Sequence, residues 1–284
     1  MIIKYISELV KKEKQKGFSD LYIKTTVKEY LQVLVLNYIY TSKEYKSKLI
    51  FTGGTCLRHF YSLERLSEDL DFDMLEEIDT SELSVKIQEY FTSILQYKDL
   101  NISVKQEGRQ ILLKFPILKE LKLANESESD LLYVKIDISE TLGKSYKLEK
   151  TTKSAFGYNF VAIHYDLPSL FAGKITAILR RNLLKGKENI QTIKGRDFYD
   201  LLWYLKRGVK VSPLLVNERL GLKSLDISSL NLEVFEKVEL ACSKYKNDFE
   251  SDLLPFISNP VFIKDYVNNY LDEIKRYKIE ELVL

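Results

Sequence analysis

Aspartates alternate with apolar residues in the stretch DLDFDM, residues 69–74. Alternation with period two predicts a β-strand, whose successive side chains point to opposite faces. Asp69, Asp71 and Asp73 would share one face, and carboxylates at i and i+2 lie about 6–7 Å apart along a strand. Asp69 and Asp71 could jointly bind Mg²⁺, a hard cation that prefers oxygen ligands and shares its coordination shell with phosphates. A solvated strand face would have the same pattern.

A third carboxylate, Asp137, belongs to the stretch LLYVKIDI, residues 131–138. Its β-branched and apolar residues predict a strand, on which Tyr133, Lys135 and Asp137 would share a face. Two metal ions about 3.5–4 Å apart can clamp the attacking and leaving oxygens of an in-line phosphoryl displacement. Asp137 is therefore the candidate third ligand. Three apposed carboxylates repel one another, so such a site needs a cation or a proton.

A glycine pair follows a short apolar run at residues 48–51. This order predicts a strand, a tight turn at Gly53 and Gly54, and then a helix. Glycine lets backbone N–H groups approach a phosphate chain closely, and the start of a helix favours the anion. Thr55 and Arg58, one helical turn apart, could face the same phosphate. A simple turn is the alternative, and the pattern is not a P-loop because no Gly-Lys-Ser/Thr follows.

The elements around these residues divide the chain in two. Helices are expected at residues 1–16 and 21–40, before the glycine turn. Beyond residue 80 we expect a helix at 81–97 capped by Thr80 or Ser81, strands at 102–106 and 110–115, and helices at 168–184, 196–206, 213–221, 231–247 and 259–279. A composition shift near residue 155 predicts an α+β domain at 1–155, with N-terminal helices, and a helical domain at 156–284.

The charge balance of the chain leaves its partners open. Lys and Arg number 43 and Asp and Glu 41, which gives a formal net charge of +2. A nucleic acid would therefore have to meet a local basic surface. The basic run Arg180, Arg181, Lys185 and Lys187 could follow an RNA backbone, although a solvated face is the alternative. The sequence contains no apolar run of about 18 residues, so it predicts no membrane span. Its two cysteines are far apart, which favours a location in the reducing cytoplasm.

Five sequence blocks together resemble one known family. They are GGTCLRHFY, RLSEDLDF, VKIDIS, LFAGKITAILRR and GRDFYDLLWYL, within residues 49–207. In this order they resemble the AbiEii/AbiGii toxins, which include the MenT toxins and belong to the DNA polymerase β-type nucleotidyltransferase superfamily. The resemblance implies a polymerase β-like core with a small mixed sheet, followed by a helical C-terminal half that completes the nucleotide site. It also implies a Mg²⁺-dependent enzyme of the EC 2.7.7 type, with two metal ions, and a separately encoded antitoxin as partner.

The resemblance also implies roles for individual residues. Triphosphate would be held by Gly53, Gly54, Thr55 and Arg58, with further phosphate contacts from Arg65 and Ser67. Asp69 and Asp71 would bind metal, and Asp137 matches the third carboxylate of the superfamily. The family motif ends at Phe72, so Asp73 becomes a bystander.

Two later motifs would supply a lysine and an aspartate. Lys174 would contact a phosphate, and Asp197 would orient or pair with a polar group near the nucleotide. Asp200 is a rival for Asp197, because both lie in the run RDFYD. A solvated lysine and a helix N-cap are the alternatives for Lys174 and Asp197.

Members of the MenT group transfer nucleotides to the 3′ acceptor end of tRNA. The resemblance therefore implies transfer of NMP from an NTP to an RNA acceptor, with tRNA as the expected partner. Two alternatives stay open at this point. The acceptor could be a protein or a small molecule, or the chain could be a non-catalytic nucleotide- or RNA-binding protein with a relic site.

Overall fold

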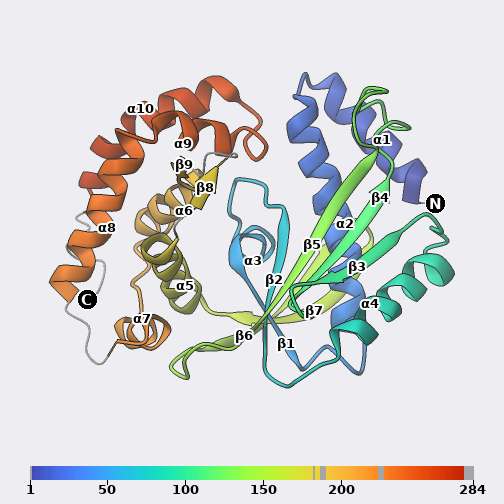
Figure 1. Ribbon diagram of the computed structural model, residues 1–284, viewed down its shortest axis with the longest axis horizontal. Coiled ribbons are helices and arrows are strands. Elements are labelled where there is room, and N and C mark those ends of the chain that lie inside the picture. Colours follow the sequence, from blue (N-terminus) through green and yellow to red (C-terminus); the bar gives the residue numbers. More distant parts are fainter. Residues whose placement is uncertain (1, 182, 186–189, 223–226, 278–284) are drawn as a thin grey trace. The chain divides into compact units, whose positions relative to one another are not determined.

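The computed structural model describes residues 2–181, 183–185, 190–222 and 227–277, and the chain forms two compact units (Figure 1). The first unit comprises Met1–Thr141 and Glu149–His164, and the second comprises Leu142–Leu148 and Tyr165–Leu284. Lys187 of the basic run and residues 278–279 of the last predicted helix lie outside the described residues.

A seven-stranded sheet forms the centre of the first unit, in the order β3-β4-β5-β2-β1-β7-β6. Its strands are β1 Leu49–Thr52, β2 Asp69–Met74, β3 Asn101–Lys105, β4 Gln110–Pro116, β5 Leu131–Glu140, β6 Leu148–Ala155 and β7 Tyr158–Tyr165. The pairs β1–β7 and β2–β5 are parallel, whereas β1–β2, β3–β4 and β4–β5 are antiparallel. The predicted α+β class with a mixed sheet is therefore confirmed.

The sheet extends further along the chain than expected. Strands β6 and β7 form a hairpin whose turn residues Phe156 and Gly157 both have positive φ, 53° and 83°. The predicted boundary at residue 155 therefore falls inside this hairpin. The sequence of β6, LEKTTKSA, has no apolar alternation because β6 is an exposed strand at the edge of the sheet.

Helix α2, Asp20–Thr41, is the most deeply buried helix of the first unit, which also contains α1 Ile2–Gln15 and α3 Gly53–Phe60. The Tyr40 hydroxyl donates to the carbonyl oxygen of Leu49 at 3.2 Å and to that of Ile163 at 3.0 Å. These two contacts tie α2 to the strands β1 and β7. The helix therefore supports the strand that leads into the glycine turn.

Helix α4, Thr80–Glu89, continues into the π-helical turn η1, Tyr90–Ile94. Its N-cap is Asp79, whose carboxylate accepts from the backbone N–H groups of Ser81 and Glu82. The prediction that Thr80 or Ser81 caps this helix is wrong, because both residues already lie inside it. Aspartate is as good a cap as serine, and Asp79 has the extended backbone that this position requires.

The second unit is mainly helical. It contains α5 Leu167–Arg180, α6 Gly195–Lys206, α7 Pro213–Leu220, α8 Ile227–Cys242, α9 Lys246–Leu253 and α10 Pro260–Lys275, and the short hairpin of β8 Leu183–Lys185 and β9 Ile190–Thr192. Helix α9 and the hairpin were not expected from the sequence. The ring of Phe171 on α5 stacks on Tyr204 of α6 with centroids 4.3 Å apart.

None of the helices in the described ranges is long and apolar enough to cross a membrane. Both cysteines, Cys56 and Cys242, carry free thiols.

Candidate active site

The glycine turn lies directly against one of the predicted metal ligands. Gly53 directly follows β1 and begins α3 with φ +75°, a conformation that side-chain-bearing residues rarely adopt. A Cβ at Gly53 would lie 2.1 Å from Asp71 Oδ2. Strand pairing explains this contact, because Thr52 of β1 is the register partner of Asp71 on β2. Glycine is therefore required at residue 53 by conformation and by space.

Gly54 faces the two residues that were expected to add phosphate contacts. A Cβ at Gly54 would lie 2.6 Å from Arg65 Nη2 and 3.1 Å from Ser67 Oγ. Arg65 is buried, and its Nη1 donates to the Leu66 carbonyl at 2.8 Å. A guanidinium thus lies beside the glycine turn, at the start of α3. This arrangement has the charge and the donors that an anion needs.

Thr55 and Arg58 make structural contacts instead of pointing into open space. The buried Thr55 hydroxyl donates to the backbone carbonyl of Asp69. Arg58 Nε lies 2.6 Å from Glu29 Oε1, and its Nη1 donates to the Leu63 and Glu64 carbonyls at 3.1 and 3.2 Å. These contacts hold α3 against β2 and α2. A phosphate role for either residue stays a prediction.

The three predicted carboxylates lie on adjacent parallel strands. In the register of β2 and β5, Asp71 is opposite Asp137 and Asp69 is opposite Lys135. Gln110 on β4 donates to Asp137 Oδ1 at 2.8 Å. Asp69, Asp71 and Asp137 are all partly exposed, whereas Asp73 is buried. The sheet therefore brings Asp69, Asp71 and Asp137 together next to Gly53.

Lys135, to which the sequence motifs assign no role, lies among these carboxylates. Lys135 Nζ is 3.2 Å from Asp69 Oδ2 and 3.0 Å from Asp137 Oδ2. Partial burial lowers the pKa of Lys135, but Asp69 and Asp137 outweigh that effect and raise the pKa above its usual value. The only sequence signal was the alternation that placed Lys135 and Asp137 on one face.

The oxygen atoms of the three carboxylates are of the type that Mg²⁺ prefers, although a cation bound there would lie close to the Lys135 ammonium. Carboxylates are the ligands that Mg²⁺ prefers, together with phosphate oxygens. Because Gly53 has no Cβ, the backbone of the turn lies directly against Asp71. Within the described ranges, no group of three or more His, Cys, Asp or Glu side chains is already arranged around a common metal position. The donor types therefore suit a divalent cation, but in this structure Lys135 lies between Asp69 and Asp137.

The later predicted residues form a cluster inside the second unit. Lys174 Nζ on α5 is 2.8 Å from Asp197 Oδ1 and 2.7 Å from Asp200 Oδ2, both on α6. Asp197 also pairs with Arg181. Both aspartates are buried, so neither is a solvated surface group. Lys174 contacts Asp197 and Asp200 at nearly the same distance. The structure therefore does not favour either aspartate as the functional one.

The charge state of Asp197 follows from this cluster. Burial by itself raises the pKa of Asp197, but the charges of Lys174 and Arg181 outweigh it and hold the pKa below its usual range. The expected alternative of Asp197 as a helix N-cap is wrong, because Lys194 occupies the cap position. The Asp197 carboxylate is therefore ionised and engaged with cations.

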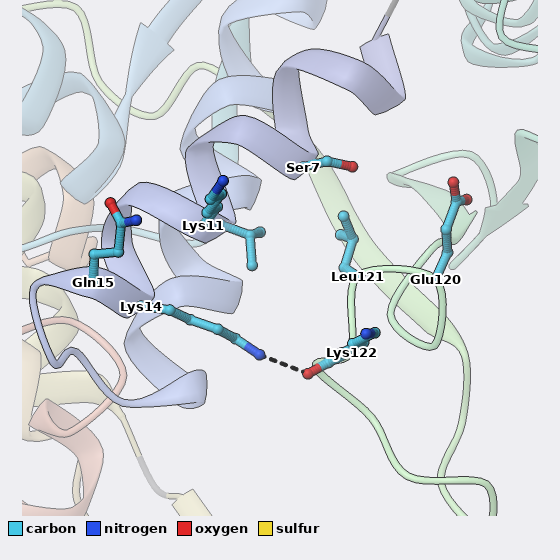
Figure 2. Close-up of a pocket in the computed structure, with 8 residues that line it drawn as sticks. Ser7, Lys11, Lys14, Gln15, Glu120, Leu121 and Lys122 are labelled. Atoms are coloured by element: carbon cyan, nitrogen blue, oxygen red, sulfur yellow. Dashed lines mark hydrogen bonds between the residues drawn. The ribbon is translucent and has the colours of Figure 1, made fainter.

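A separate groove of about 520 Å³ lies between α1 and the segment after β4 (Figure 2). Its lining includes Lys11, Lys14, Glu120, Leu121 and Lys122. Lys14 Nζ reaches across it and donates to the Lys122 carbonyl at 2.8 Å, as the dashed line in Figure 2 shows. None of the predicted site residues lines this groove, so it is distinct from the carboxylate site.

The fold is that of nucleotidyltransferases. The chain resembles the solved structure of MenT4, a nucleotidyltransferase toxin from Mycobacterium tuberculosis H37Rv, with a TM-score of 0.52 and 14% identity over 98% of this chain and 93% of that one. A candidate nucleotidyltransferase from H. pylori gives a TM-score of 0.44 and 15% identity over 88% and 96% of the two chains. Comparison of the sequence with the curated proteins finds no match.

Residues 36–277 match the family described as "Nucleotidyl transferase AbiEii toxin, Type IV TA system". This match covers most of the chain and includes every predicted site residue. The chain therefore belongs to the AbiEii family of nucleotidyl transferase toxins from type IV toxin–antitoxin systems, and the family resemblance is confirmed.

Proposed function

We propose that this toxin transfers NMP from an NTP to an RNA acceptor, and that the acceptor is the 3′ end of tRNA. The observation that carries the proposal is the contact between the glycine turn and the carboxylates. Gly53 lies against Asp71, which is in register with Asp137 on the next strand. A glycine turn that could bind phosphate is thus adjacent to carboxylates that could bind metal, as transfer from a metal-bound triphosphate requires.

The triphosphate is bound by the turn and by its neighbouring cation. Backbone N–H groups at Gly53 and Gly54 donate to phosphate oxygens, and the buried Arg65 guanidinium beside Gly54 adds positive charge. Ser67, next to the same glycine, is placed to donate a hydroxyl. Lys174, held by Asp197 and Asp200, is a further phosphate contact by family resemblance.

Asp69, Asp71 and Asp137 would hold Mg²⁺, in a two-metal arrangement. When bound, Mg²⁺ neutralises the charge of the phosphates and of the leaving group. Asp137, through a second metal or as the base, activates the acceptor hydroxyl, which gives up its proton. The hydroxyl oxygen then forms a bond to the α-phosphorus, the bond from that phosphorus to the bridging oxygen breaks, and pyrophosphate leaves. Orientation of the reactants by this chain accounts for much of the rate.

The biological setting follows from the family. A type IV toxin–antitoxin system implies an antitoxin as partner and NTP as substrate. We propose that the toxin acts in the cytoplasm, where NTP and tRNA are present together.

Incubation with total RNA and each α-labelled NTP in turn, with Mg²⁺, tests the proposal. We expect one gel band of tRNA size to gain label, and the label to disappear when the metal is chelated. Label on a polypeptide or on a small molecule would instead identify a different acceptor. NTP binding without any labelled product would favour a non-catalytic nucleotide-binding protein.

A further inference from the structure

Lys135 occupies the position between two of the proposed metal-binding carboxylates. Its Nζ lies 3.2 Å from Asp69 on the neighbouring strand and 3.0 Å from Asp137 on its own strand. Alternation along β5 places Lys135 and Asp137 on the same face, and strand register places Lys135 opposite Asp69. The contact therefore follows from the architecture of the sheet and is not a chance meeting of surface side chains.

Lys135 and the two carboxylates form a partly buried cluster of charges. The side chains of Lys135, Asp69 and Asp137 are 32%, 19% and 30% exposed, so all three charges are partly shielded from solvent. Asp137 Oδ1 already accepts from Gln110, and its Oδ2 accepts from Lys135. Without Lys135, two carboxylates would face each other with no positive charge between them.

We propose that Lys135 is a built-in counterion that holds Asp69 and Asp137 in place in the metal-free toxin and competes with the divalent cation for them. The inference rests on the proposed function, because it takes these aspartates as metal ligands. A cation bound by Asp69 and Asp137 would be repelled by an ammonium close to the same oxygens. The lysine stem is flexible and has a single point charge, so Lys135 can swing away when the cation arrives.

Two consequences follow for the site. The carboxylates are preorganised before metal binds, because Lys135 offsets their mutual repulsion. Metal alone binds more weakly than the three aspartates would allow without the lysine. The NTP, whose phosphates bring further negative charge, then favours metal entry.

Mn²⁺ titration followed by electron paramagnetic resonance tests the competition directly, because it reports bound metal without any turnover. We expect Lys135→Met to bind Mn²⁺ at least about ten-fold more tightly than the wild type, since one nearby positive charge has gone. Lys135→Arg keeps the charge and should behave as the wild type does. Lys114→Met is the matched control, because Lys114 lies on the neighbouring strand β4 and has no carboxylate partner among the described residues.

Thermal unfolding gives a second readout. In EDTA we expect Lys135→Met to melt at a lower temperature than the wild type, and Mn²⁺ to raise its melting temperature by more. Should this variant fail to fold in EDTA, Lys135→Gln provides the same comparison with an uncharged polar side chain. Mn²⁺ affinity that is unchanged or weaker in both variants would overturn the proposal.

The two proposals fail separately. Tighter Mn²⁺ binding by Lys135→Met in a protein that never labels RNA would contradict the proposed function but support the proposal that Lys135 is a counterion. Labelling of RNA by a wild type whose Mn²⁺ affinity does not respond to Lys135→Met would contradict only the counterion.

Discussion

At the scale of single residues, Gly53 joins backbone conformation to site chemistry. It has φ +75°, and a Cβ there would overlap Asp71 Oδ2. A glycine pair predicts a turn, so the turn at Gly53 could be predicted from the sequence alone. The contact with Asp71 depends on the pairing of β1 with β2, which no local pattern encodes.

Gly53→Ala should therefore lower both stability and activity. Positive φ alone costs an alanine about 1–2 kcal/mol, and the clash with Asp71 adds to that cost. Gly157→Ala is the matched control, because Gly157 has φ +83° and open space around it. Urea unfolding should show a larger loss for Gly53→Ala, together with loss of RNA labelling. Equal losses of stability and normal labelling would show that the contact with Asp71 is unimportant.

His59 on α3 makes stability depend on pH. Burial, with the nearby charges of Lys153 and Arg58, lowers the pKa of His59 from 6.5 to about 3. Between these values the unfolded chain binds a proton that the folded chain does not. Stability should therefore fall as pH drops below 6.5, by up to about 1.4 kcal/mol per pH unit for one proton.

His59→Leu should remove that contribution. Urea unfolding of the variant and the wild type at several pH values from 7.5 to 4.5 would measure the difference in slope. Other groups titrate equally in both proteins, so the difference isolates His59. Identical slopes would mean that the folded protein protonates His59 as readily as the unfolded chain does.

At the scale of elements, Lys174 connects α5 to α6 inside the second unit. It is the shared partner of Asp197 and Asp200, and Asp200 is completely buried. Lys174→Met should cost about 3–5 kcal/mol of stability, because it removes the cation that two buried carboxylates share. Lys206→Met, which breaks the more exposed pair with Glu273, should cost less than about 1 kcal/mol. Chemical denaturation compares the two, and equal costs would contradict a buried, strongly coupled cluster.

The strands show which elements a sequence can predict. Period-two alternation at residues 69–74 and 131–138 was sufficient for β2 and β5, because each has one buried face. Strand β6 lacks this pattern because it lies exposed at the edge of the sheet. Alternation places Lys135 on the correct face but predicts no role for it, since a strand lysine is usually solvated and its partner Asp69 is 66 positions away.

At the scale of the whole molecule, the family match and the structural likeness both extend across the two units. The groups that the family resemblance assigns to chemistry are divided between them. The glycine turn and the three carboxylates belong to the first unit, and the Lys174 cluster belongs to the second. The order of motifs was sufficient to identify the family. The predicted boundary missed the full extent of the first unit, although the sequence of β7, YNFVAIHY, has alternating buried positions and the strand pairs with β1.

The central claim is that the carboxylates beside the glycine turn carry NMP transfer, and Asp71→Asn tests it most directly. Labelling of RNA by α-labelled NTP should be measured for the wild type, for Asp71→Asn and for Asp73→Asn. Asp73 lies on the same strand but outside the family motif, so it is the control. We expect Asp71→Asn to lose transfer by at least about a hundred-fold and Asp73→Asn to retain it. Full transfer by a folded Asp71→Asn protein would contradict the account.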